Sequence, residues 1–193
     1  MKRVSNREKI LNEGLKVVHA HGFANASVRD IVAAAGVPQG SFTNHFESKE
    51  AFGLEILDLY FAGSRATMRE TLLNEALDPF KRLRAWIDRN AERGHANGFR
   101  NGCLIGNFTA EAAAHSPAMR KRLSAMIGEI QAAIAACLKA AVKTGDLPKG
   151  FDCAGTAEFI FTAMQGATLL SKAEGNAAPI EQFKKTLFAK VLR

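Results

Sequence analysis

The sequence predicts an all-α protein of about nine helices, and three observations support this fold class. Apolar residues recur at intervals of three and four along most of the chain, which places them on one face of a helix. Two Ser-x-x-acidic patterns, Ser5 with Glu8 and Ser27 with Asp30, have the form of capping boxes, which begin helices. No stretch alternates apolar and polar residues as a half-buried strand does, so no β-sheet is expected.

The first predicted helix begins after Ser5 and ends at Gly22. Its apolar face has helical spacing and consists of Ile10, Leu11, Leu15 and Val18. Gly14 lies within this helix and allows a neighbouring helix to come close. We expect Phe23, which follows the helix end, to fill the core of an N-terminal three-helix head.

Residues 27–46 have the pattern of two short helices joined by a tight turn. Gly36 ends the first helix, and Pro38 suits the first turn of the second because its φ is already helical. Phe42 and Phe46 are four residues apart and share one face. Small or hydrogen-bonding residues remain for the other side, namely Gln39, Gly40, Ser41, Thr43, Asn44 and His45. This is the layout of a helix-turn-helix that presents its second helix to the DNA major groove.

The run from Ala35 to Phe46, followed by Ser48-Lys49-Glu50, resembles the signature of the tetracycline-repressor-type (TetR) family of regulators. The resemblance extends from near Arg7 to about Leu57. It implies a helix-turn-helix DNA-binding domain at residues 1–47, an effector-binding and dimerisation domain at residues 48–193, and a homodimer. The family usually has tyrosine at the position of Thr43, whose hydroxyl has a shorter reach toward a phosphate.

Alignment with that family also implies roles for individual residues. Base-facing residues are expected at Arg29, Gln39, Gly40 and Ser41. Phosphate contacts are expected at Ser27, Thr43, His45 and Lys49. Asn44 points outward on the second helix and is able to contact either a base or a phosphate.

Ser48 begins a fourth, longer helix that connects the head to the body. Further helices are predicted over residues 78–93, 103–114, 116–144, 152–172 and 179–192, with a glycine-rich break at residues 95–102. The last two helices are expected to form the dimer interface, because small residues share one face of the first of them and permit close helix approach. These interface candidates are Ala163, Gly166, Ala167 and Leu170. Core packing within one subunit is the alternative interpretation of the same face.

The net charge of +7, from 26 Lys and Arg against 19 Asp and Glu in 193 residues, is compatible with a polyanionic partner. Residues 1–50 carry only seven basic against five acidic residues, so charge alone does not locate a DNA-binding surface. Near the N-terminus, basic residues crowd around one acidic residue: Lys2, Arg3, Arg7 and Lys9. Such an arm contacts phosphates or the minor groove in some proteins and is a solvated tail in others.

Enzyme, cofactor and metal chemistry are not expected. Gly36 to Gly40 is not followed by the Gly-Lys-Ser/Thr of a phosphate loop, and no Gly-x-Ser-x-Gly surrounds Ser41. The five histidines and three cysteines have no spacing typical of a zinc site. The N-terminus lacks the apolar segment of a signal peptide, and no membrane span is expected.

Cys103 is the candidate sensor residue. If a helix begins there, the thiol lies in its first turn, near Arg100, and both local fields favour the reactive thiolate. Residues 102–108 also resemble a branch of the TetR family in which a cysteine senses electrophiles or oxidants. The alternative is a small buried residue that packs between helices. Cys137 and Cys153 are expected in the core, and the odd number of separated cysteines favours reduced thiols in the cytoplasm.

These observations predict a cytoplasmic, homodimeric regulator that binds double-stranded operator DNA, most simply a repressor relieved by a small-molecule effector or by modification of Cys103. Two other classes stay open. One is a ligand-independent activator or DNA-architectural binder. The other is an enzyme or protein-partner module in which the head no longer binds DNA.

Overall fold

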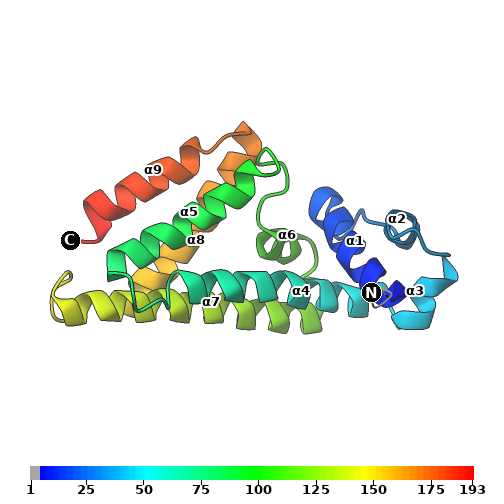
Figure 1. Cartoon of the computed structure of the whole chain (residues 1–193), viewed down its shortest axis with the longest axis horizontal. Helices are drawn as coiled ribbons and strands as arrows, with labels where there is room; N and C mark the ends of the chain where they lie inside the picture. The colour runs from blue at the N-terminus through cyan, green and yellow to red at the C-terminus, as the bar shows by residue number, and fades with distance from the viewer. Residues whose placement is uncertain (1–4) are drawn as a thin grey trace. The chain divides into compact units, whose positions relative to one another are not determined.

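Nine α-helices and one π-helical turn form the regular structure of residues 5–193, the part of the chain that the computed structural model describes (Figure 1). Their bounds are α1 (Asn6–His21), α2 (Val28–Ala34), α3 (Gly40–His45), α4 (Lys49–Glu70), α5 (Pro79–His95), α6 (Leu104–Glu111), α7 (Pro117–Thr144), α8 (Cys153–Glu174), α9 (Ala178–Thr186) and η1 (Leu187–Val191). Residues 5–193 contain no strand. The predicted all-α class is confirmed.

Both predicted capping boxes are present. The Ser5 hydroxyl accepts a hydrogen bond from the Glu8 N–H at 3.2 Å, and the Glu8 carboxylate accepts one from the Ser5 N–H at 2.9 Å. Ser27 and Asp30 make the same exchange, each at 3.1 Å. Two of the helix starts are therefore set by bonds between residues only three apart in the chain.

Two predicted helices end at least three residues before their predicted ends, and the other bounds differ by no more than two residues. The helix expected over 103–114 is shorter and runs from Leu104 to Glu111. It cannot extend further back because Gly98, Phe99 and Gly102 have φ near +60°, outside the right-handed helical region. The last helix likewise changes at Leu187 into a π-helical turn.

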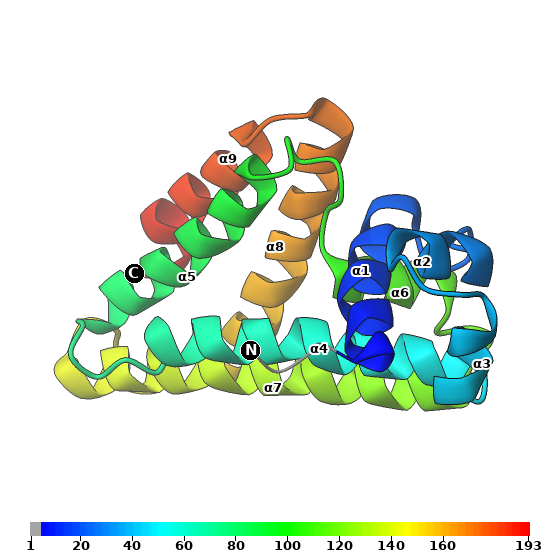
Figure 2. The same cartoon turned by 45° about the vertical axis from the view of Figure 1, so that its right-hand side comes forward.

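The chain forms two compact units, which are described separately. The first contains residues up to Gly63 together with Leu104–Ser124, and the second contains Ser64–Cys103 together with Ala125–Arg193. Figure 2 shows α6 beside α1 within the first unit. The division predicted between residues 47 and 48 follows the functional domains that the family resemblance implies. Packing instead groups α6 and the first parts of α4 and α7 with α1, α2 and α3.

Aromatic rings fill the core of the first unit. The rings of Phe42, Phe46 and Phe52 lie 5.2 to 5.3 Å apart between centroids. Gly14 gives them room, because a Cβ atom there would lie 2.5 Å from the Phe52 ring. This confirms the close helix approach predicted at Gly14.

Charged side chains join the helices of the same unit at its surface. Arg7 of α1 donates to Glu55 of α4 at 2.5 Å. Arg122 of α7 makes a two-pronged contact with Asp58 of α4, at 2.7 and 2.5 Å. Such paired bonds restrict the orientation of the two helices as well as their separation.

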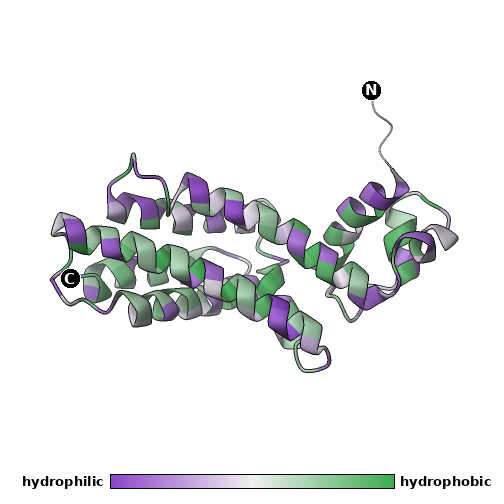
Figure 3. Cartoon of the chain, turned by 90° about the horizontal axis from the view of Figure 1, so that it is seen from below, coloured by the Kyte–Doolittle hydropathy of each residue, from purple (hydrophilic) through white to green (hydrophobic). Residues whose placement is uncertain are grey.

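The second unit has an apolar core contributed by α5, α7 and α8. Its members include Leu83, Trp86, Ile87, Met126, Ile134, Leu138, Ile160 and Met164. By length and composition alone α7 would be able to cross a membrane, a test that the core helix of a soluble protein also passes. Figure 3 shows hydrophilic and hydrophobic residues mixed along the helices.

Candidate DNA-binding surface, sensor thiol and dimer face

The turn between α2 and α3 has the form predicted for a helix-turn-helix. Gly36 has φ of +62°, and the Val37 N–H donates to the Val32 carbonyl at 3.1 Å, so the chain reverses directly after α2. Ile31 and Val32 are buried beneath the turn. The apolar side of α2 thereby fixes where α3 begins.

The α3 helix separates its aromatic residues from its polar ones. Phe42 and Phe46 are only 2% and 4% exposed. The other side carries five of the six predicted contact residues as exposed positions, Gln39, Gly40, Thr43, Asn44 and His45, with Ser41 half-buried beside them. Within the described chain a Cβ at Gly40 would meet no atom within 4 Å, so packing of the chain does not require glycine at this position.

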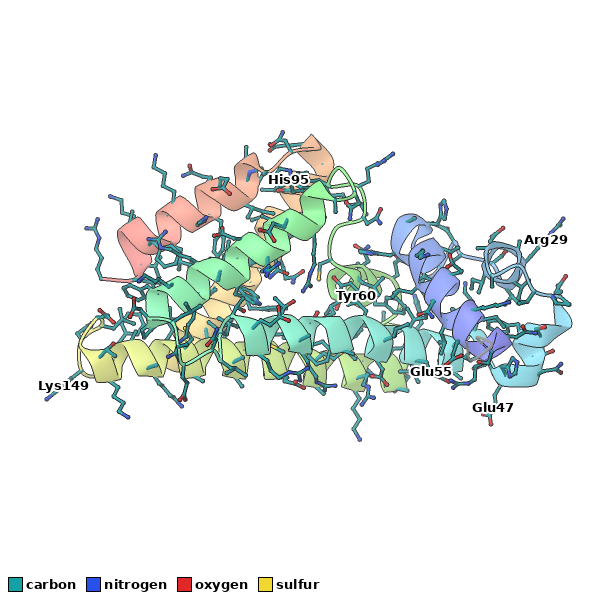
Figure 4. The ribbon with its side chains drawn as sticks, in the orientation of Figure 1. Arg29, Glu47, Glu55, Tyr60, His95 and Lys149 are labelled. Atoms are coloured by element: carbon teal, nitrogen blue, oxygen red, sulfur yellow. The ribbon has the colours of Figure 1, made fainter. Side chains whose placement is uncertain are left out.

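On α2 the two predicted DNA contacts differ in how their side chains are used. The Ser27 hydroxyl belongs to the capping box and also donates to the Asp30 carboxylate at 2.5 Å. These bonds from Ser27 hold the pKa of Asp30 below its usual value. Arg29 is exposed and projects outward from α2 (Figure 4).

Two residues predicted to contact phosphate have partners inside the chain. The Thr43 hydroxyl donates to the Gly40 carbonyl at 3.1 Å, one turn back in the same helix. The Lys49 ammonium donates to the Ala24 carbonyl at 3.1 Å and lies 4.9 Å from the centre of the Phe23 ring. Burial lowers the pKa of Lys49, and the carboxylate of Glu111 opposes this effect. An ammonium has three N–H donors, so two are left for the predicted phosphate contact.

Phe23 and Arg7 make contacts that differ from those predicted from the sequence. Phe23 is half-buried and packs against Phe108 of α6, with 4.8 Å between ring centroids, instead of filling the centre of the three-helix head. The Arg7 guanidinium lies 5.4 Å from the centre of the Phe46 ring and is paired with Glu55, so it joins α1 to α4. Lys2 and Arg3, the other basic residues considered for a DNA-contacting arm, lie outside the described residues.

Comparison with known proteins agrees with this geometry. Residues 10–56 match the family model described as bacterial regulatory proteins, tetR family, and residues 79–187 match the tetracyclin repressor-like, C-terminal domain. The chain belongs to the TetR family. It is a DNA-binding regulator of transcription whose TetR-family helix-turn-helix comprises α2 and α3.

Relatives of this TetR-family chain span nearly its whole length. The HTH-type transcriptional repressor DhaR of Mycobacterium sp. (strain GP1) is 33% identical over 192 residues, which are 100% of this chain and 95% of DhaR. The transcriptional regulator AcuR of Cereibacter sphaeroides is 32% identical over 93% of this chain and 82% of AcuR. A crystal structure described as regulatory protein TetR from Rhodobacter sphaeroides superposes with a TM-score of 0.89 and 29% identity, over 94% of this chain and 96% of that one.

Cys103 of this TetR-family chain lies immediately before α6, one residue earlier than the first turn in which it was expected. The thiol is half-buried, and the side-chain amide of Gln165 donates to its sulfur at 3.6 Å. The Arg100 guanidinium is turned to the Asn97 carbonyl, which it contacts at 3.3 Å through Nε. Gln165, from α8, is a neighbour of the thiol that sequence reasoning missed, because 62 residues separate the two.

The other two cysteines are buried, as predicted. Cys137 donates from its sulfur to the Pro79 carbonyl at 3.1 Å. Burial raises the pKa of the Cys137 thiol to about 11. Cys137 is therefore a protonated core thiol at neutral pH.

The four predicted dimer-face residues, Ala163, Gly166, Ala167 and Leu170, line a groove of about 430 Å³ between α8 and α9. Its walls are almost entirely apolar and include Phe159, which is 50% exposed, and Leu170, which is 55% exposed. Ala167 is only 6% exposed, since its side chain packs within the subunit. Across the described part of the chain no group of three or more His, Cys, Asp or Glu is arranged to hold a metal ion.

Proposed function

We propose that this TetR-family regulator is a homodimeric repressor that leaves its operator when a small molecule binds or when Cys103 is modified. The observation that carries the DNA-binding part is the division of α3, which has two buried aromatic residues on one side and exposed polar residues on the other. A helix of this kind is held firmly from behind while its hydrogen-bonding groups face a partner. The relative DhaR, named as a repressor, supports the sign of regulation.

Within this proposal Gln39, Gly40, Ser41 and Arg29 face the bases. Glutamine suits adenine, to which it donates and from which it accepts in the major groove. Gly40 lets the helix backbone approach the DNA, which explains a glycine that the fold itself does not need. Phosphate contacts come from Ser27, Thr43, His45 and Lys49, and Asn44 reaches either partner.

In this proposal the dimer forms through the groove between α8 and α9. Five large hydrophobic side chains are exposed in the described chain, and three of them, Phe159, Leu169 and Leu170, belong to α8. Exposed apolar surface of this size favours association with another protein surface. A two-fold symmetric partner is the simplest occupant, because two heads that read successive major grooves need half-sites roughly 34–36 Å apart.

The sensing part of the proposal concerns the body and Cys103. The thiol is half-buried, unlike the two core cysteines, and it directly precedes the helix that packs beside α1. A non-covalent effector or a covalent change at Cys103 would favour a body conformation in which the two heads no longer match the half-site spacing. The protein would act in the cytoplasm, where its thiols stay reduced.

Selection of duplexes from a randomised pool, followed by footprinting, tests the proposal. A recovered sequence with two related half-sites, bound by a protein that sediments as a dimer, is the expected result. Binding without any sequence preference would favour a DNA-architectural protein. Failure to bind any duplex at low salt would contradict the proposal and favour a protein-partner module.

A further inference from the structure

The turn between α1 and α2, residues 22–26, is held from two sides by side chains of two other helices. From α6, the Phe108 ring packs on Phe23, and the Glu111 carboxylate accepts a hydrogen bond from the Ala24 N–H at 2.9 Å. From α4, the Lys49 ammonium lies over the Phe23 ring and donates to the Ala24 carbonyl. The same two turn residues are thus contacted by α4 and by α6.

Two charged side chains of opposite sign hold the backbone groups of Ala24. Its N–H donates to Glu111 and its C=O accepts from Lys49, so both hydrogen-bonding groups of one exposed loop residue have charged partners. Hydrogen bonds to charged groups are stronger than those between neutral groups. The carboxylate of Glu111 also favours the charged form of Lys49. Glu111 and Lys49 therefore bind the same residue, Ala24, from two different helices.

Gly22 is shaped to receive the same carboxylate. Its φ is +85°, a conformation that favours glycine, and a Cβ atom there would lie 2.7 Å from Oε1 of Glu111. The Glu111 carboxylate therefore lies beside the Cα of Gly22, where a side chain would collide with it, and accepts a hydrogen bond from the N–H of Ala24.

The position of Glu111 in its own helix is unfavourable. It is the last residue of α6 and the one charged residue in the sequence of that helix. A negative charge at a helix C-terminus opposes the helix dipole. The Glu111 carboxylate is stabilised instead by the α1–α2 turn, 87 residues earlier in the chain. The contact therefore holds α6 to that turn and does not stabilise α6 alone.

We infer that Glu111 is a positioning residue for DNA binding, which fixes the α1–α2 turn from α6 and so makes operator affinity depend on α6. The turn ends at Ala26, and the next residue, Ser27, is the cap of α2. Release of Ala24 would loosen the start of α2 and, through α2, the placement of α3. This inference rests on the proposed function and adds a contact, from Glu111 to Ala24, that would place α2 and α3 for DNA binding.

Three variants separate the effect of the negative charge of Glu111 from the effect of its side-chain length. Glu111→Gln keeps the acceptor oxygen and the length without the charge, Glu111→Asp keeps the charge on a shorter side chain, and Glu111→Ala removes both. Affinity is measured for a duplex obtained in the selection above and for a scrambled duplex of equal length. Glu70→Ala is the matched control, because Glu70 is the last, exposed residue of α4.

The Ala and Asp variants should bind the selected duplex roughly tenfold more weakly, with unchanged affinity for the scrambled duplex. The Gln variant should recover part of the loss, because it keeps the acceptor oxygen without the charge, and Glu70→Ala should behave as wild type. Hydrogen exchange of the Ala24 amide should be faster in the Ala and Asp variants than in wild type or the Gln variant.

Each other outcome has one meaning. Faster exchange at Ala24 without any change in preference for the selected duplex overturns the inference and leaves the proposed function intact. Wild-type behaviour of Glu111→Asp also overturns it. If the wild type itself does not distinguish the two duplexes, the proposed function fails first.

Discussion

The outer face of α3 and the groove between α8 and α9 are both exposed helix surfaces, yet they are built in opposite ways. On α3 the aromatic side chains, Phe42 and Phe46, are buried and the polar residues face outward. On α8 an aromatic side chain, Phe159, is itself exposed, and the groove beside it is almost entirely apolar. The first surface keeps hydrogen-bonding groups available to a polar partner, whereas the second lowers its free energy only by losing contact with water.

This difference indicates two kinds of partner. Hydrogen-bonding groups on a helix held from behind suit the base edges and phosphates of DNA. Exposed apolar side chains suit a second protein surface, and small residues at Ala163 and Gly166 let that surface come close. The first predictions below change one of these two surfaces, and the later ones change Cys103 and the cap of α2.

The largest effect is expected at the groove. Gly166→Leu fills space that a partner would occupy, while inside the subunit a Cβ at residue 166 meets no described atom within 4 Å. The dimer should dissociate at micromolar concentration, and operator affinity should fall on the order of a hundredfold, because one head alone makes half of the contacts. Analytical sedimentation and DNA titration measure the two quantities.

Gly128→Leu on α7 is the control for that change. It is also an exposed helical glycine with open space at its Cβ, so both variants gain roughly 0.8 kcal/mol in helix propensity. Loss of the dimer in Gly166→Leu alone would assign the effect to the groove. An unchanged dimer in Gly166→Leu would remove the groove as the interface.

On the reading helix, Gln39→Ala should cost about 1–3 kcal/mol of discrimination at one base position in each half-site. Lys49→Met should instead reduce the salt slope by roughly one counterion per half-site and should weaken binding without changing the preference at any one base position. Titration of single-base operator variants at several salt concentrations separates the two effects. Uniform loss in both variants would show that the roles of Gln39 and Lys49 are wrongly assigned.

The three thiols should react at different rates. Cys103 is half-buried, whereas Cys137 and Cys153 are buried, and burial raises the pKa of Cys137 to about 11. N-ethylmaleimide at pH 7 should therefore label Cys103 roughly tenfold faster than either of the others. Timed labelling followed by mass spectrometry measures the three rates, and equal rates would contradict the prediction.

The same reagent tests whether Cys103 controls DNA binding. Operator DNA should be released as Cys103 is labelled, and Cys103→Ser should bind DNA normally but no longer release it. A Cys137→Ser variant should still respond as wild type does. Release that persists in Cys103→Ser would leave Cys103 as a packing residue and would point to a non-covalent effector.

The smallest effect concerns the cap of α2. Ser27→Ala should destabilise the head by about 1 kcal/mol, because it removes an acceptor for the Asp30 N–H. Ser124→Ala, at an exposed position inside α7, should cost less. Chemical denaturation of both variants measures the difference, and equal stability would show that the cap is not needed to hold α2.

Because the cap of α2 includes a carboxylate, we also expect its contribution to stability to depend on pH. The bonds from Ser27 lower the pKa of Asp30 from its ordinary value of 3.8. A lowered folded-state pKa means that the stabilisation is complete above pH 3.8 and is lost as the pH falls through the folded value. The difference in free energy of unfolding between wild type and Ser27→Ala should therefore shrink as the pH falls below 3.8. Acid titration of the two proteins measures this difference.

Local patterns in the sequence predicted most of the helices and the polar face of α3. Capping boxes at Ser5 and Ser27 involve residues three apart, so their outcome does not depend on the rest of the fold. The end of α2 at Gly36 and the pairing of Phe42 with Phe46 follow in the same way from short spacings. The start of α6 was predicted one residue early; Gly102, two residues before the helix, has φ of +68°, a conformation that no spacing in the sequence predicts.

By itself, then, the sequence determined the fold class, the helix-turn-helix and the apolar character of α8, all of which depend on spacing within a few turns of helix. Only the tertiary structure decided which side chains serve as partners across long separations. Lys49 binds the Ala24 carbonyl, Gln165 reaches Cys103, and Glu111 holds the α1–α2 turn from 87 residues away. No local pattern sets such contacts, because they depend on where packing brings α4, α6 and α8 within their own units.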